Sequence, residues 1–247
     1  MSSRAPIRHA SVLKTETTIT LDAAAVRGLR ARDISAKEAF TLVDSEGRFF
    51  RAALTSVKKG SGKARVYEQM SESTESPAHI TLLCAVLNRQ RMMVVMQKAT
   101  ELGVSCIIPV LSERSVPREG LDHQKASSWP KQVLRAARQC RRASLPEVRE
   151  AVDLASVVEE ACFTEADQRL YLDNESNAVR TLAGVERPRG TTKIAFAVGP
   201  EGGWSDDERA LLVERGALAL NLGARVVRAE TAVMVGLTLL QQAYGDF

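Results

Sequence analysis

The feature that most constrains this fold is the alternation of apolar runs with helix-like segments after residue 79. The run 80–87 is continuously apolar, as a strand buried on both faces of a parallel sheet requires. Further strands are expected in the short apolar stretches 106–110, 170–172, 193–198 and 217–222. Helical patterns separate them, at 91–102, 130–142, 206–215 and 231–244. This alternation predicts an α/β domain in which helices cover a parallel sheet.

The first 70 residues have a different pattern. Residues 17–21 and 39–43 have strand character, and Asp44–Gly47 has the composition of a hairpin turn before a strand at 49–57. A short helix is expected at 23–30. Short pieces of this kind predict a small β-barrel. The polar, Ser- and Glu-rich stretch that follows indicates a linker, so the expected limits are 1–70, a linker at 71–79, and 80–247.

Positive charge is concentrated in the N-terminal part of the chain. Residues 1–70 hold 13 basic and 7 acidic side chains, whereas residues 71–247 hold 21 and 23. The whole chain carries a net charge of +4. Such a distribution is typical either of a solvated basic face or of a surface that binds a polyanion such as nucleic acid.

Composition also narrows the classes of site. The four cysteines lack Cys-x-x-Cys spacing and only three histidines exist, so no metal site is expected and the thiols are expected to be free. No apolar run approaches the roughly 20 residues of a membrane span, and the first residues lack the apolar centre of a signal peptide. These features predict a cytoplasmic protein that does not contact membranes.

Two loops at strand ends are candidates for ligand binding. Gly199-Pro-Glu-Gly-Gly-Trp-Ser follows one strand and matches neither a Walker A loop nor Gly-x-Gly-x-x-Gly. Ser205 and Glu208 have capping-box spacing, so a helix is expected to begin there. The second loop, Gly223-Ala-Arg-Val-Val-Arg-Ala-Glu-Thr, precedes the last helix, which Glu230 or Thr231 would cap. Since ligands of parallel sheets bind at the carboxyl ends of strands, the two loops predict a shared pocket.

A third feature is a basic helical stripe within 130–142. Arg135, Arg138 and Arg142 have the spacing of one helix face, and Lys131 extends it. Such a face is often only solvated, but it also suits contacts to phosphates.

The two loops resemble those of the RsmE family. Gly199-Pro-Glu-Gly-Gly-Trp-Ser followed by Leu222-Gly-Ala-Arg-Val-Val-Arg-Ala-Glu-Thr-Ala is similar to the paired motifs of these SPOUT-class enzymes, which methylate N3 of a uridine in 16S ribosomal RNA. Lys98-Ala-Thr-Glu-Leu-Gly-Val and Ile108-Pro109 support the similarity, which extends over essentially the whole chain.

The resemblance implies a PUA-like β-barrel followed by a SPOUT-type parallel sheet with a C-terminal trefoil knot. It also implies a homodimer, S-adenosylmethionine as cofactor, and 16S rRNA within the small ribosomal subunit as partner. Transferred by position, the cofactor would contact Leu172, Gly199, Pro200, Glu201, Gly202, Gly203, Leu222, Gly223, Val227, Arg228, Thr231 and Ala232.

The chemistry of the reaction suggests further roles. As N3 of uracil loses its proton, negative charge spreads onto the flanking carbonyl oxygens, which a guanidinium would stabilise. The candidates are Arg228, Arg8 and Arg30. Glu201 or Glu230 would accept the proton or orient an arginine, and a carboxylate beside arginines favours the orienting role. The expected RNA contacts are Arg8, Arg30, Lys131, Arg135, Arg138 and Arg142.

Other functions fit the same sequence less well. A SPOUT methyltransferase acting elsewhere, such as on a ribose hydroxyl of tRNA, shares the fold. A non-catalytic RNA-binding assembly factor would keep the fold and lose affinity for the cofactor. A nucleotide hydrolase is disfavoured, because no phosphate-loop lysine or metal-binding carboxylate pair accompanies the glycines.

Overall fold

The computed structural model describes residues 4–58, 60–174 and 192–247. They form two compact units, an N-terminal unit (Met1–Glu75 with Leu134–Leu145) and a C-terminal unit (Ser76–Val133 with Pro146–Phe247). Residues 134–145 therefore group with the first unit, although the alternating pattern that predicts the second domain runs through them. The expected domain limits, 1–70 and 80–247, stay a prediction.

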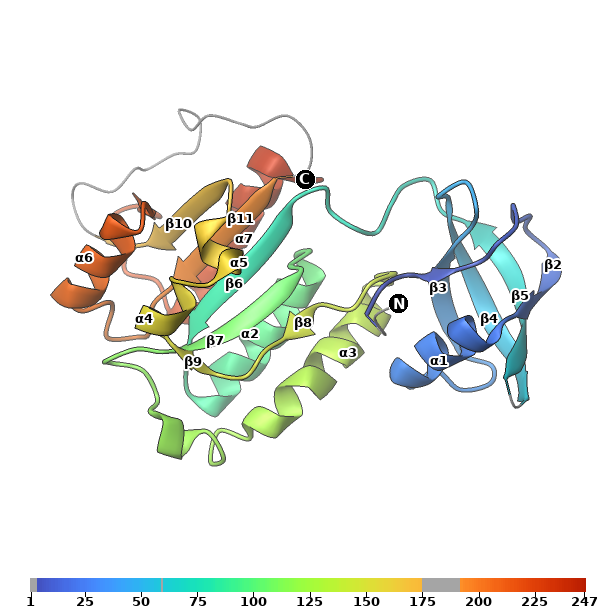
Figure 1. Ribbon diagram of the computed structural model, residues 1–247, viewed down its shortest axis with the longest axis horizontal. Helices are drawn as coiled ribbons and strands as arrows, with labels where there is room; N and C mark the ends of the chain where they lie inside the picture. Colours follow the sequence, from blue (N-terminus) through green and yellow to red (C-terminus); the bar gives the residue numbers. More distant parts are fainter. Residues whose placement is uncertain (1–3, 59, 175–191) are drawn as a thin grey trace. The chain divides into compact units, whose positions relative to one another are not determined.

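The N-terminal unit is built on a five-stranded sheet in the order β1-β3-β4-β5-β2 (Figure 1). Only β1 and β3 pair in parallel. The strands are β1 (Ile7–Arg8), β2 (Thr17–Leu21), β3 (Ala39–Val43), β4 (Phe49–Lys58) and β5 (Ser61–Gln69). Helix α1 (Ala23–Ala31) begins at Asp22, whose side chain accepts a hydrogen bond from the backbone of Ala25. Its apolar face packs into the core of this unit together with Phe40, Phe50 and Leu54.

The C-terminal unit is a seven-stranded, wholly parallel sheet in the order β12-β10-β11-β6-β7-β8, with β9 also paired to β7. This confirms the predicted α/β class. Its strands are β6 (His79–Ala85), β7 (Cys106–Leu111), β8 (Glu147–Val148), β9 (Val152–Asp153), β10 (Gln168–Leu172), β11 (Lys193–Val198) and β12 (Leu218–Leu220). Its helices are α2 (Arg89–Glu101), α3 (Trp129–Gln139), α4 (Leu154–Val157), α5 (Ala161–Thr164), α6 (Asp206–Glu214) and α7 (Ala229–Tyr244). The residues of α3 from Leu134 onward group with the N-terminal unit.

Helices cover both faces of the parallel sheet (Figure 1). The side chains of α2 and α7 share a core with alternate residues of the central strands, such as Leu82 and Phe196. The intervening residues, such as Leu83 and Ala197, face the other core, to which α4, α5 and α6 contribute. Every residue of 80–87 is buried. The continuous apolar run thus reflects a strand that faces a helical layer on each side.

The turn between β3 and β4 depends on Asp44. Its carboxylate accepts hydrogen bonds from the backbone N–H groups of Leu13, Glu46 and Arg48 at 2.9–3.2 Å, and from the Arg48 side chain at 2.7 and 3.0 Å. Burial by itself would raise the pKa of Asp44, but these donors outweigh it and lower the pKa. The sequence prediction of a hairpin turn at Asp44–Gly47 is confirmed, with Gly47 at φ +79°.

Replacing Asp44 by Asn should weaken this turn. Because the folded-state pKa lies below the ordinary value, the carboxylate stabilises the fold above about pH 4 and this contribution is lost as the pH falls further. We expect Asp44→Asn to lower the opening free energy of β3 and β4 by about 2–3 kcal/mol at pH 7. Hydrogen exchange of these amides as a function of pH measures it. The exposed neighbour Glu46→Gln is the control, with an expected change under about 0.5 kcal/mol. Equal protection in Asp44→Asn and wild type at pH 7 would refute the assignment.

Candidate active site

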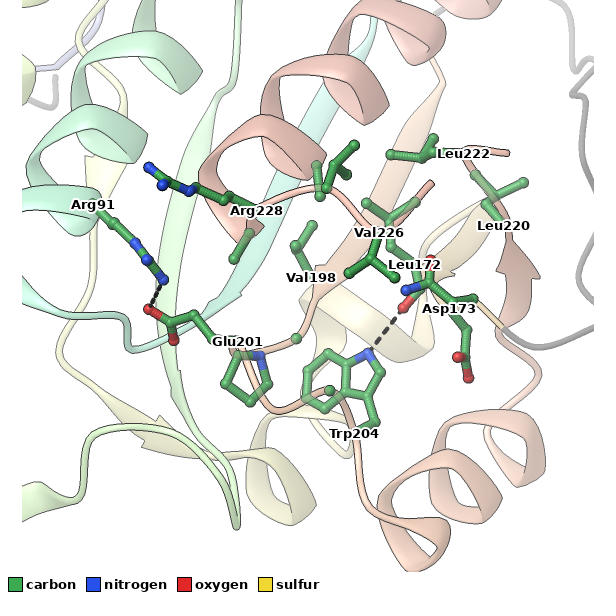
Figure 2. Close-up of a pocket in the computed structure, with 17 residues that line it drawn as sticks. Arg91, Leu172, Asp173, Val198, Glu201, Trp204, Leu220, Leu222, Val226 and Arg228 are labelled. Carbon is green, nitrogen blue, oxygen red and sulfur yellow. Dashed lines mark hydrogen bonds and ion pairs between the residues drawn. The ribbon is translucent and has the colours of Figure 1, made fainter. Parts of the chain in front are cut away.

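A pocket of about 290 Å³ lies at the carboxyl ends of three neighbouring strands of the C-terminal unit, β10, β11 and β12. Parallel pairing brings these ends together, since Tyr171 pairs with Ala197 and Leu172 with Leu220. The loops that leave the three strands therefore line one cavity, together with the start of α7 (Figure 2). A pocket therefore lies between the two glycine-bearing loops, where the sequence predicts a shared pocket.

Trp204 anchors the first of these loops. Its side chain is 2% exposed, and its indole Nε1 donates to the carbonyl oxygen of Leu172 at 3.2 Å (Figure 2). A Cβ on Gly199 would lie only 3.0–3.2 Å from the indole, so glycine allows the backbone to pack directly on the ring. The loop then enters α6 through the predicted capping box of Ser205 and Glu208, which the structure confirms.

The second loop, residues 221–228, connects β12 to α7. Buried Asn221 accepts a hydrogen bond from the backbone of Gly223 at 2.7 Å, and Gly223 has φ +109°, a conformation that favours glycine. Val226 is 85% exposed and lies at the pocket. The expected capping of α7 by Glu230 or Thr231 is wrong. The N-cap is Arg228, which makes no side-chain capping hydrogen bond, so both residues lie inside the first turn.

One end of the pocket is charged. Figure 2 shows Arg91, Glu201 and Arg228 at this end, away from Leu172, Leu220 and Leu222. Arg91 donates from Nη1 to Glu201 Oε1 at 2.5 Å, and its Nε lies 3.7 Å from Glu230 Oε2. The arginine that both Glu201 and Glu230 contact is thus Arg91, which the sequence did not single out.

The buried Cys84, near the end of β6, lies close enough to Glu201 for the charge of the carboxylate to affect the thiol. Burial first, and then the negative charge of Glu201, raise the pKa of its thiol to about 12. Cys84 is therefore a protonated, packed thiol at neutral pH, and all four cysteines are free, as expected.

Most of the residues expected at the cofactor meet at this pocket. Those that line it are Leu172, Gly199, Pro200, Glu201, Gly203, Leu222, Val227, Arg228 and Ala232. Gly202, Gly223 and Thr231 lie in the same loops or the first turn of α7 without lining the cavity. Gly202 instead offers its carbonyl oxygen to Arg114 at 3.0 Å.

Sequence reasoning missed a second set of lining residues. They are Arg91, Asp173, Asn174, Val198, Trp204, Leu220, Val226 and Ala229. Trp204, Val226 and Ala229 lie within the two motifs, and the others except Arg91 lie in or directly after predicted strands, so these signals could have found them. Arg91 is different, because it comes from the start of α2 and no pattern in the sequence indicates it.

The expected RNA-contacting residues are distributed over the N-terminal unit and α3. Arg8 and Arg30 are exposed. Lys131 and Arg135 are exposed on α3, one turn apart. Their contact with RNA stays a prediction.

The other two arginines of the predicted stripe are engaged within the N-terminal unit. Arg138 donates to Glu38 at 2.5 Å and to the carbonyl oxygen of Asp33 at 3.0 Å. Arg142 pairs with Glu75 at 2.8 Å and only 6% of its side chain is exposed. The predicted helix limit of 142 is wrong, because α3 ends at Gln139 and Arg141 takes a φ of +64°. Arg142 therefore does not continue the helical stripe.

Two classes of feature are absent from the described residues. None of the helices they form combines the length and apolarity needed to cross a membrane. The same residues contain no group of three or more His, Cys, Asp or Glu side chains placed to hold a metal ion.

Comparison with known proteins identifies the family. The model of the RNA methyltransferase domain family matches residues 74–241, which include the whole pocket. The chain is 30% identical over 223 residues to ribosomal RNA small subunit methyltransferase E of Synechocystis, covering 90% of this chain and 72% of that protein. The chain belongs to the ribosomal RNA small subunit methyltransferase E family. The family resemblance stated from the two loop motifs is thereby confirmed.

Other members of this methyltransferase family agree. The Aquifex aeolicus protein of the same name is 30% identical over 216 residues, covering 87% of this chain and 90% of its own. The crystal structure of the Neisseria gonorrhoeae protein, bound to S-adenosyl methionine, is 30% identical with a TM-score of 0.70. That alignment covers 98% of this chain and 99% of the other.

The contact between Gly199 and Trp204 can be tested by mutation. We expect Gly199→Ala to destabilise the C-terminal unit by about 1–3 kcal/mol, because the new methyl group overlaps a buried ring. In Trp204→Leu the ring is absent, so the further cost of Gly199→Ala should nearly vanish. Urea denaturation of the four proteins in a double-mutant cycle measures this coupling. Strictly additive effects would contradict the proposed contact.

Proposed function

We propose that this protein is an S-adenosylmethionine-dependent methyltransferase that methylates N3 of a uridine in 16S rRNA of the small ribosomal subunit. The observation that carries the proposal is the single pocket that the two family loops form at the ends of β10, β11 and β12. It belongs to a chain that aligns over 98% of its length with a relative bound to this cofactor.

The residues of the pocket fit the cofactor. Its apolar end, with Leu172, Leu220 and Leu222, suits a flat heterocycle. Asp173, at the same end, offers carboxylate oxygens that suit ribose hydroxyl groups. We assign the cofactor to the residues expected from the family motifs, with Asp173 and Trp204 added from the geometry.

The bound cofactor supplies an electrophilic methyl group on a sulfonium. The protein must then hold the acceptor base in line and stabilise the charge that develops as N3 is deprotonated. Arg228 lies at the charged end of the pocket, whereas Arg8 and Arg30 belong to the N-terminal unit. Glu201 is bound to a guanidinium, which supports its orienting role over proton abstraction.

RNA binding is assigned to the basic N-terminal unit and to α3. The PUA-like barrel is supported by the five-stranded sheet, which shares one apolar core with α1. The exposed pair Lys131 and Arg135 presents two positive charges on one helix face. Arg138 and Arg142 would contribute after exchanging carboxylate partners for phosphates.

The trefoil knot is supported by the path of the chain after β12. This strand lies at the edge of the sheet beyond β10, yet α7 packs on α2 and β11. Residues 221–228 make the return between them. The segment 175–191 lies outside the described residues.

A homodimer is part of the proposal. Val94 on α2 and Val235 and Leu239 on α7 are exposed apolar side chains on two helices that pack together. Such side chains suit an interface with a second copy. Sedimentation of the purified protein at micromolar concentration tests the dimer.

The decisive experiment is methyl transfer to small ribosomal subunits that lack the modification. We expect a single N3-methyluridine in 16S rRNA, mapped by nuclease digestion and mass spectrometry. Cofactor binding without transfer to this RNA would favour another RNA substrate. Loss of cofactor binding would favour a non-catalytic assembly factor.

The salt dependence of RNA binding tests the role of α3. We expect Lys131→Gln with Arg135→Gln to weaken binding and to reduce the slope of log K against log salt by about 1–2 units, because each phosphate contact contributes about 0.7–0.9. The matched control is Lys193→Gln, which removes an exposed charge at the opposite end of β11 from the pocket. Unchanged slopes in the double variant would remove α3 from the RNA interface.

A further inference from the structure

Arg91 occupies an unusual position at the charged end of the pocket. It comes from the first turn of α2, yet it is bonded to Glu201 from the β11–α6 loop and lies beside Glu230 from the first turn of α7. Its side chain is 28% exposed, between carboxylates that are 37% and 14% exposed. One guanidinium thus connects the two family loops at a place where it still lines the cavity.

The contacts of Arg91 leave most of its hydrogen-bonding capacity unused. A guanidinium has five N–H donors, and within the described part of the chain the one hydrogen bond found for this side chain is that from Nη1 to Glu201. The approach to Glu230, at 3.7 Å, is an ion pair, and Glu230 Oε2 is buried with no hydrogen-bond partner. The arginine is therefore oriented by two charges while other donors remain for a molecule in the pocket.

The same contacts argue against Glu201 as a base. Its Oε1 already accepts a short hydrogen bond from Arg91. The other charged or titratable groups at this end are Glu230, Arg228 and the buried thiol of Cys84. Arg228 is exposed, and no ion pair is found for it among the described residues, whereas Arg91 lies between two carboxylates. Preorganised donors stabilise developing charge better than mobile ones.

We infer that Arg91 is a catalytic residue, whose free N–H donors bond a carbonyl oxygen of the acceptor uracil, and that Glu201 and Glu230 are its positioning residues. The inference rests on the proposed function. The N3 proton leaves to solvent, and the charge that remains on the ring is stabilised by Arg91. The N3 electron pair then forms the bond to the methyl carbon as the carbon–sulfur bond breaks, with its electrons passing to sulfur.

Substitution of Arg91 tests this directly. We expect Arg91→Ala to lower kcat by about 10²–10³-fold, the range seen when a preorganised donor to a developing anion is removed. The dissociation constant for S-adenosylmethionine, measured by calorimetry, should change by less than about threefold, because the apolar end of the pocket is intact. The matched control is Arg89→Ala, which removes an exposed charge from the same turn of α2 outside the pocket and should leave kcat unchanged.

The pH profile separates a catalytic role from a structural one. Without the cation, deprotonation of N3 is less favourable, so the rising limb of kcat should move to higher pH by about one unit or more in Arg91→Ala. Guanidinium ion added to this variant should restore part of the rate. Glu201→Gln should keep the rising limb and lose less than about tenfold in kcat, whereas a general base at this position would lose the limb altogether.

Each outcome decides the inference. A normal kcat in Arg91→Ala would overturn the inference. An unshifted pH profile together with weakened cofactor binding would also overturn it, and would make Arg91 a cofactor-binding residue. If Arg91→Ala fails to fold, Arg91→Lys, which keeps the charge and loses the planar fork, should show the same rate loss with a smaller shift; equal activity in Arg91→Lys and wild type would overturn the inference. Absence of methyl transfer by the wild-type protein would instead overturn the proposed function itself.

Discussion

The parallel pairing of β10 with β11 and β12 is the constraint on which the rest of the site depends. Because the three strands run in the same direction and their ends are in register, their carboxyl ends meet at one edge. Side chains from the three loops that follow these strands therefore lie close together at this edge. The indole of Trp204 fixes this arrangement by bonding to the end of β10 from the loop after β11. Apolar clusters on both faces of the sheet pack against these strands beneath the pocket.

Much of the fold could be predicted from the sequence because its signals are local. Strands β2, β3 and β11 have the limits expected from their apolar patterns, and α6 begins at the predicted capping box. Strand β5 was missed for a physical reason. Its inward residues, Gly62, Ala64 and Val66, are small, so the alternation is real but weakly hydrophobic. Strands β8 and β9 have two residues each, too few for any period to be recognised.

The site divides in the same way. Of the nine expected cofactor residues that line the pocket, eight lie in two continuous motifs next to strand ends, and the ninth, Leu172, ends β10. The end of α3 could not be predicted, since residues after Gln139 are held by contacts with Glu75, 67 to 69 residues earlier in the chain. Arg142 satisfies the helical spacing of a basic stripe, and only its tertiary partner reveals that it is an internal ion pair. Periodicity reports which face a residue occupies, but it does not report what that face meets.

The same limit explains why the sequence does not indicate Arg91. The sequence offers Arg228, Arg8 and Arg30 as candidate guanidinium groups, and it does not specify which arginine Glu201 or Glu230 would orient. In the structure these carboxylates meet Arg91, 110 residues before Glu201, because β6 is the neighbour of β11 and α2 begins just after β6. Two carboxylates that lie against one guanidinium restrain its position without occupying all of its N–H donors. The fold thus turns two residues that resemble proton acceptors into the support for a hydrogen-bond donor.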